Sequence, residues 1–145
     1  MRPSGVEPTA IRPIASSFSL ASGLASAVAA ASLNFFAKSG GLPAGSHIAL
    51  IAKNTAQWLM TDWAIWMAGH VSVPLYPTLA ADTIRQILEH SEAKLLFVGK
   101  LDGWDGMKPG VPDGLPCIAM PLAPATAYPA WDDIIARTAP LTGEP

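Results

Sequence analysis

The sequence predicts an α/β fold, with a partial parallel sheet of three to four strands and flanking helices. Three short runs are almost entirely apolar, and the chain between successive runs is long enough for one helix; the runs are His47–Ala52, Val71–Leu75 and Lys94–Val98. Strands that are apolar on both faces belong inside a sheet that helices cover, which is typical of parallel sheets. Right-handed strand–helix–strand connections then make the three strands parallel.

The composition limits the function. The chain has 145 residues, enough for one domain, with 50% hydrophobic residues, 14% charged residues and a net charge of −2. Because no basic surface is expected, nucleic-acid binding is disfavoured. Cys117 is the single cysteine, so it forms no internal disulfide and has no second thiol for a zinc site. These features indicate a reducing compartment, and we expect the cytoplasm.

Residues 1–39 are considered separately from the rest of the chain. Between Arg12 and Lys38 no residue is charged, and Leu20, Leu24, Val28, Ala31 and Phe35 recur at helical spacing. The serines of this stretch make it a poor transmembrane span, since each hydroxyl needs a partner in lipid. An amphipathic helix is the favoured interpretation; a signal or transit peptide over residues 1–31 is the alternative.

The first helix after the Gly40–Gly45 turn is expected to begin at Asn54 or Thr55, either of which can cap it. Gly69 is suited to its C-terminal end. Three tryptophans in this helix predict deep burial against the sheet. On that hypothesis Trp66→Ala costs about 3–5 kcal/mol.

The following elements complete the prediction. Pro74 lacks an N–H group and is expected at a strand end or a bulge. A second helix turns Ile84, Ile87 and Leu88 to one face, and residues 99–114 are expected to form a loop with one helical turn around Trp104. A fourth strand over Cys117–Met120 and a short helix over Tyr128–Ile135 follow.

The loops that follow the strands contain no phosphate cradle. Ligands of parallel α/β sheets bind beyond the carboxyl ends of the strands, here at residues 53–55, 76–78 and 99–100. Neither the Gly-rich lysine loop nor Gly-x-Gly-x-x-Gly occurs there. Lys53 and Lys100 are more simply explained as solvated lysines than as anion ligands.

No catalytic set emerges from the remaining polar residues. His47, His70 and His90 lie in different elements without metal-ligand spacing, and structural roles are favoured for them. Asp62 lies between tryptophans, so it is either a tuned acid or, more simply, a capped or solvated residue. Asp132 and Asp133 are adjacent and diverge on a helix, and Gly45-Ser46-His47 is no nucleophile elbow.

Three segments in order resemble the adenylate-forming enzymes, the AMP-binding acyl-CoA synthetase superfamily. The segments are Gly45-Ser-His-Ile-Ala-Leu-Ile-Ala-Lys-Asn-Thr-Ala-Gln-Trp58, residues 64–78 ending in Val-Pro-Leu-Tyr-Pro-Thr, and residues 87–98. Together they look most like the long-chain fatty acid–CoA ligases. Ser46, His47 and Gln57 depart from the family, which prefers Asp, Arg and Glu at these positions.

The resemblance implies that residues 40–145 are the N-terminal portion of an AMP-binding domain, truncated before the family's phosphate loop. It also implies ATP, Mg²⁺ and coenzyme A as cofactors of full-length relatives, which convert a fatty acid to an acyl-adenylate and then to its CoA thioester. No position here matches the family's catalytic, nucleotide-binding or magnesium-binding motifs. We therefore assign no catalytic, cofactor or metal residue and expect a fragment that is inactive alone.

Two alternatives remain open. One is a free-standing α/β binding or interaction module, or one half of a split acyl-activating enzyme whose remainder is its partner. The other is a secreted domain behind a signal peptide. In any of these cases a sheet of three or four strands is expected to leave an edge and an apolar face uncovered.

Overall fold

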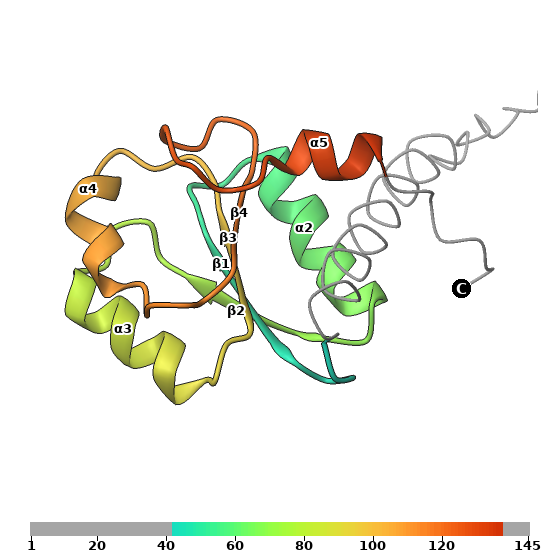
Figure 1. Cartoon of the computed structure of the whole chain (residues 1–145), viewed down its shortest axis with the longest axis horizontal. Helices are drawn as coiled ribbons and strands as arrows, with labels where there is room; N and C mark the ends of the chain where they lie inside the picture. Colours follow the sequence, from blue (N-terminus) through green and yellow to red (C-terminus); the bar gives the residue numbers. More distant parts are fainter. Residues whose placement is uncertain (1–41, 138–145) are drawn as a thin grey trace, which may run out of the picture.

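The computed structural model describes residues 42–137, and these form a parallel sheet between two layers of helices (Figure 1). The strands are β1 (His47–Ile51), β2 (Val71–Leu75), β3 (Leu95–Val98) and β4 (Cys117–Ala119). Their order across the sheet is β2-β1-β3-β4, and every pair is parallel. The predicted parallel α/β class and all four predicted strands are confirmed, with ends that differ by at most one residue.

Within residues 42–137, two helices cover each face of the sheet. Helices α2 (Ala56–Met67) and α5 (Trp131–Ala136) lie on one face, and α3 (Ala81–His90) and α4 (Trp104–Met107) on the other (Figure 1). A short 3-10 turn, η1 (Lys108–Gly110), follows α4. Because β1 and β3 are central and buried on both faces, their side chains enter the two hydrophobic clusters alternately.

The cap and stop predicted for α2 are both present. The Thr55 side chain accepts a hydrogen bond from the backbone N–H of Trp58 at 3.1 Å, so Thr55 rather than Asn54 caps the helix. Gly69 has a φ of +76°, a conformation that glycine adopts without a steric penalty. The next strand therefore follows after a tight turn, with the N–H of His70 bonded to the carbonyl of Ile65 at 3.0 Å.

The deep burial predicted for the three tryptophans of α2 is wrong, since Trp58 and Trp63 are only partly buried and the largest departure is at Trp66. Its side chain is 61% exposed, whereas Ala64 and Ile65 are buried against the sheet. The reason is helical phase: Trp66 lies one step beyond the inward-facing positions and turns toward solvent. The cost of about 3–5 kcal/mol expected for Trp66→Ala assumed an enclosed site and does not apply to this exposed position.

Pro74 lies one residue before the end of β2, opposite Leu50. The strand tolerates a proline there because β2 is an edge strand, and the missing N–H faces away from the sheet. The short helix predicted from Tyr128 begins only at Trp131, since the preceding residues approach β4, with a parallel bridge between Ala119 and Ala130. Residues 1–39, the predicted N-terminal helix and its alternative leader, lie outside the described residues.

Candidate functional site

The carboxyl ends of β1, β2 and β3 meet at one edge of the sheet, as the parallel order requires. The loop after β1 lies beside the loop after β3, because the N–H of Lys53 donates to the carbonyl of Lys100 at 2.8 Å. Lys53 also forms an ion pair with Asp102, and both side chains are exposed. The hydrogen bond and charge of Lys53 lower the pKa of Asp102, with a smaller contribution from Lys100.

This pairing bears on whether the two lysines form an anion site. Lys53 already has a carboxylate partner in the structure, and the pair is open to water. Exposed ion pairs of this kind contribute little to stability and are easily exchanged. Whether Lys53 or Lys100 binds an anion therefore stays a prediction.

Gly99 is needed for packing at the end of β3. A Cβ atom at this position would lie 2.5 Å from Met120 Cε and 2.6 Å from Ala52 Cβ. Both contacts are much shorter than van der Waals distance, so a side chain at residue 99 would displace its neighbours. The glycine therefore lets the end of β3 pass between two side chains, and the carboxyl edge contains no glycine-rich phosphate cradle in residues 52–55, 76–80 or 99–103.

A small apolar cavity of about 290 Å³ opens at the carboxyl ends of β1 and β2. It is lined by Ala52, Asn54, Trp58, Pro74, Leu75, Tyr76 and Pro77. Asn54 is its one amide side chain, and Tyr76 is largely exposed at its rim. The sequence analysis missed this cavity because it depends on β1 and β2 ending side by side; the aromatic residue directly after an apolar strand was the available signal.

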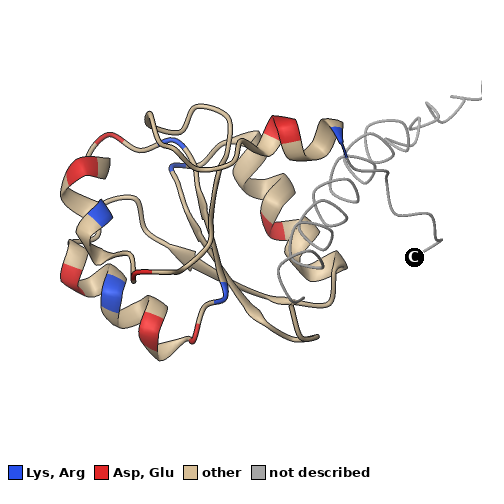
Figure 2. Ribbon diagram, in the orientation of Figure 1, with Lys and Arg blue, Asp and Glu red and all other residues tan. Residues whose placement is uncertain are grey.

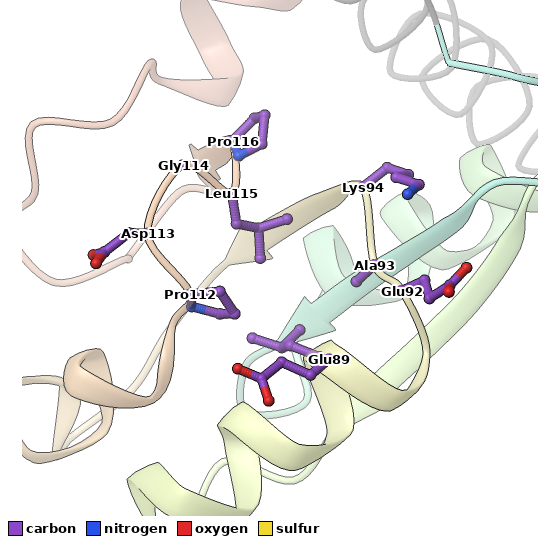
Figure 3. A pocket seen from close by; sticks show the side chains of 10 residues that line it. Glu89, Glu92, Ala93, Lys94, Pro112, Asp113, Gly114, Leu115 and Pro116 are labelled. Carbon is purple, nitrogen blue, oxygen red and sulfur yellow. The ribbon is translucent and has the colours of Figure 1, made fainter.

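A second cavity, of about 480 Å³, lies at the opposite edge of the sheet (Figure 3). It is open to solvent between the end of α3 and residues 112–116, and Glu89, Glu92, Lys94 and Asp113 contribute its charged groups. No group of three His, Cys, Asp or Glu side chains within residues 42–137 is placed to hold a metal ion. This position, at the amino ends of the strands, is also unusual for the ligand site of a parallel sheet.

The histidines and Asp62 are not brought together. His47 Nδ1 lies 2.5 Å from the carbonyl oxygen of Ser91, which ties the start of β1 to the end of α3. His70 is buried immediately before β2, and burial lowers its pKa. His90 lies in the last turn of α3, where a cation is favoured. Asp62 is buried and accepts a hydrogen bond from Ser72 Oγ at 2.5 Å, so it joins α2 to β2.

The surroundings of the single thiol, Cys117, favour a structural role. Cys117 is buried in β4, and burial raises its pKa to about 11. A thiol with this pKa is almost wholly protonated near neutral pH and is a poor nucleophile. Asp132 and Asp133 are both exposed in the first turn of α5, on different sides of it, so they form no carboxylate pair.

Comparison with known proteins identifies a matching family and several relatives. The family described as AMP-binding enzyme matches residues 25–130. Over 57 residues the chain is 37% identical to long-chain-fatty-acid–CoA ligase FadD15 of Mycobacterium bovis, a match that covers 39% of this chain and 10% of the ligase. Long chain acyl-CoA synthetase 6, a peroxisomal protein of Arabidopsis thaliana, is also 37% identical over 57 residues, covering 39% of this chain and 8% of the synthetase.

Solved structures show the same fold. The anthranilate CoA ligase AuaEII, solved in complex with anthranoyl-AMP, superposes with a TM-score of 0.69 and 22% identity over 88% of this chain and 24% of its own. The long-chain-fatty-acid–CoA ligase FadD1 of Archaeoglobus fulgidus superposes with a TM-score of 0.64 and 20% identity. This match covers 84% of this chain and 23% of the ligase. The matches thus span about a tenth of the curated relatives and about a quarter of the solved chains. Among the described residues no helix is both long and apolar enough to cross a membrane.

Proposed function

This chain belongs to the AMP-binding enzyme family, and on that premise we propose that it supplies framework for a fatty acid–CoA ligase rather than the groups that carry out the reaction. The full reaction joins a fatty carboxylate to AMP at the expense of ATP, with Mg²⁺, and then transfers the acyl group to coenzyme A. The curated relatives named above support the fatty acid as substrate. The observation that carries the framework role is the carboxyl edge of the sheet.

That edge does not fit a triphosphate. Stabilising the charge that develops on phosphate oxygens requires converging backbone N–H groups, cations or a metal ion. In residues 42–137, Lys53, which follows β1, is paired with Asp102. The side chains of Ala52 and Met120 occupy the space around Gly99, which follows β3. We therefore derive no step of nucleotide chemistry from these residues, and we propose no catalytic, cofactor-binding or metal-binding residue among them.

What these residues do is hold a rigid sheet. Thr55 and Gly69 fix the ends of α2, Asp62 bonds α2 to β2, and His47 bonds β1 to the end of α3. Such bonds keep the carboxyl edge in one arrangement, which is what a site assembled from several segments needs. The proposal includes a reducing compartment, the cytosol, because the single cysteine is a buried free thiol.

The first test measures ATP–pyrophosphate exchange by purified residues 1–145 in the presence of palmitate and Mg²⁺. We expect no exchange above a buffer control, because no described segment can hold the triphosphate. Robust fatty-acid-dependent exchange would show that these residues carry out adenylation themselves. Addition of a polypeptide that carries a Thr-Ser-Gly-Thr-Thr-Gly loop distinguishes one half of a split enzyme, which gains activity, from an independent binding module, which does not.

A second test asks whether the framework is interchangeable. Residues 42–137 would replace the superposed segment of the Archaeoglobus fulgidus ligase, and acyl-CoA formation from palmitate would be measured. The expected result is an active chimera, and a loss of activity when the same chimera carries Gly110→Ala, which disrupts packing of the framework. A chimera that folds with native-like circular dichroism yet activates no fatty acid would contradict the proposal.

A further inference from the structure

The chain contains three Asp–Gly dipeptides, and all of them lie between β3 and β4. They are Asp102–Gly103, Asp105–Gly106 and Asp113–Gly114. An aspartate that precedes a glycine can react with its own main chain, because glycine has no Cβ atom to shield its backbone nitrogen. The fold places the three dipeptides in different surroundings, and these surroundings decide which of them can react.

The reaction closes a ring and then opens it. The backbone nitrogen of the glycine bonds to Cγ of the protonated aspartate, and the carboxyl OH leaves with the amide proton as water. Water then adds to one of the two ring carbonyls. Opening at Cγ restores aspartate, whereas opening at the α-carbonyl gives isoaspartate, whose main chain runs through Cβ and Cγ. Ring closure therefore needs a neutral carboxyl group, an accessible N–H group and a backbone that is free to rotate.

The dipeptide Asp105–Gly106 is held in place by α4. The N–H group of Gly106 donates to the carbonyl of Gly103 at 3.2 Å, so the nitrogen that would attack is already engaged. Trp104 and Met107 lie on either side of the dipeptide, and both are buried against the sheet. The backbone here is therefore fixed in a helical conformation.

The dipeptide Asp102–Gly103 is restrained by charge. Its carboxylate forms the ion pair with Lys53, and this pairing lowers the pKa of Asp102, with a smaller contribution from Lys100. A carboxylate is a poor electrophile, so a partner that favours the ionised form reduces the fraction of molecules that can close the ring. Leu101, the residue before the dipeptide, is also buried.

The dipeptide Asp113–Gly114 has neither restraint. Both residues are exposed at the centre of a turn, which the N–H group of Leu115 closes with a long hydrogen bond of 3.3 Å to the carbonyl of Pro112. Gly114 has a φ of +81°, and a Cβ atom there would meet nothing within 4 Å. The space around the glycine nitrogen is therefore open.

The carboxylate of Asp113 is also free. Within residues 42–137 its side chain has no hydrogen-bond or ion-pair partner. Figure 3 shows this side chain directed away from those of Leu115 and Glu89. All three requirements for ring closure are thus met at this dipeptide and not at the other two.

We propose that Asp113–Gly114 is a site of spontaneous modification, at which aspartate converts to isoaspartate while the fold protects the other two dipeptides. The product inserts one atom into the main chain inside the turn, so the bond from Leu115 to Pro112 cannot keep its geometry. Leu115 packs against the hydrophobic cluster that contains Cys117 of β4, and the modification therefore loosens the start of this strand. The modified chain is a substrate for the class of methyltransferases that repair L-isoaspartate. The inference is independent of the ligase role, because it concerns one turn.

Peptide mapping of the aged chain tests the proposal. Purified residues 1–145 would be incubated at neutral pH and physiological temperature and then digested with trypsin. One peptide, residues 101–137, carries all three dipeptides, because trypsin does not cleave between Lys108 and Pro109. Electron-transfer fragmentation of this peptide locates isoaspartate. We expect it to accumulate at Asp113 about tenfold faster than at Asp105, because one hydrogen bond lowers the population of open backbone by roughly that factor.

Two controls isolate the effect of the fold. In urea the chain is unfolded, and the three dipeptides should react at similar rates because each ends in glycine. Lys53→Ala removes only an exposed ion-pair partner, so the variant should fold. In this variant isomerisation at Asp102 should rise several-fold, while the rate at Asp113 stays unchanged.

Three results would overturn the proposal. They are equal accumulation at the three dipeptides of the folded chain, a maximum at Asp102 or Asp105, and no isoaspartate at Asp113 under conditions in which the unfolded chain reacts. A second measurement uses an L-isoaspartyl methyltransferase with labelled S-adenosylmethionine. The parent chain should gain methyl groups with age, and Asp113→Glu, whose longer side chain does not form the five-membered ring, should gain far fewer. Equal labelling of the two chains would place the modification elsewhere.

Discussion

Helices α2 and α3 cover opposite faces of one sheet, yet their outward surfaces differ in chemistry. The outward side of α3 carries Asp82, Arg85 and Glu89, and Arg85 lies 3.6 Å from Glu89 at spacing i, i+4. The outward side of α2 carries three exposed apolar residues, Leu59, Trp66 and Met67. Because both helices bury apolar residues against the sheet, the difference lies only in what each helix meets on its far side. The comparison shows that the outward face of α3 is charged and that the outward face of α2 is apolar; Figure 2 shows several charged residues along α3.

The contrast extends to how each helix is held. The chain returns to α3 through η1, where Arg85 Nη2 donates to the carbonyl of Pro109 at 2.7 Å. Gly110 approaches the backbone of Ala81 so closely that a Cβ atom would lie 2.2 Å from its carbonyl oxygen. The α3 side is thus covered by the described chain itself, whereas Leu59, Trp66 and Met67 of α2 are exposed within residues 42–137.

The largest effect is expected from Ile84→Ala, inside the α3 interface. Ile84 is 0% exposed, so truncation removes buried methyl groups and leaves a cavity. The free energy of unfolding should fall by about 2–5 kcal/mol, measured by urea denaturation. The matched control Gln86→Ala, on the exposed side of the same helix, should change it by less than about 0.5 kcal/mol. Equal effects of the two variants would show that the inward and outward sides of α3 are assigned incorrectly.

The next largest effect is expected from Gly110→Ala. The free energy of unfolding should fall by about 1–3 kcal/mol, because the new methyl group must push η1 away from α3. Gly106→Ala in α4 is the control, since nothing lies within 4 Å of a Cβ atom there and alanine favours a helix. Thermal unfolding of the two variants checks the prediction. If Gly110→Ala unfolds at the temperature of the parent chain, the close approach is not required.

Trp66→Ala tests the α2 side of the comparison. The Trp66 side chain is 61% exposed within the described residues, so its truncation removes little buried surface. The free energy of unfolding should fall by about 1 kcal/mol or less, measured by urea denaturation. A loss as large as that of Ile84→Ala would show that Trp66 is enclosed in the folded chain.

The smallest effect is a pH dependence at the start of β2. Burial lowers the pKa of His70 below its ordinary 6.5, so the folded chain binds a proton there less readily than the unfolded chain. The contribution is fully present above about pH 6.5 and is lost as the pH falls from that value through the lowered pKa. His70→Gln should therefore show a shallower loss of stability between about pH 7.5 and pH 5.5 than the parent chain. An identical slope would show that His70 is as easily protonated in the fold as in water.

Local patterns in the sequence were sufficient to predict the strands and helices of the fold and its parallel class, but not the order of the strands. The four strands, the Thr55 cap and the Gly69 stop each depend on neighbouring residues, and each is present. The burial of Trp66 was predicted wrongly because it was inferred from residue type, whereas helical phase decides it. Residue type alone does not tell which side of the helix a tryptophan faces.

The features of the carboxyl edge could not be predicted in the same way. The Lys53–Asp102 pair joins residues 49 positions apart, and the cavity near Asn54 and Tyr76 exists because β1 and β2 end side by side. Both depend on strand order, which local periodicity does not specify. The absence of a phosphate-loop motif from residues 1–145 could be read from the sequence, because that motif is a continuous pattern.

Binding of Mg–ATP to residues 1–145, measured by isothermal titration calorimetry, tests the framework role most directly. A full-length acyl-CoA ligase serves as the positive control for the same titration. The account predicts no saturable binding up to about 1 mM nucleotide, because these loops offer no cradle for phosphates. Saturable binding of ATP at low micromolar concentration, lost when Lys53 and Lys100 are replaced by Ala, would show that these residues grip the nucleotide and would contradict the account.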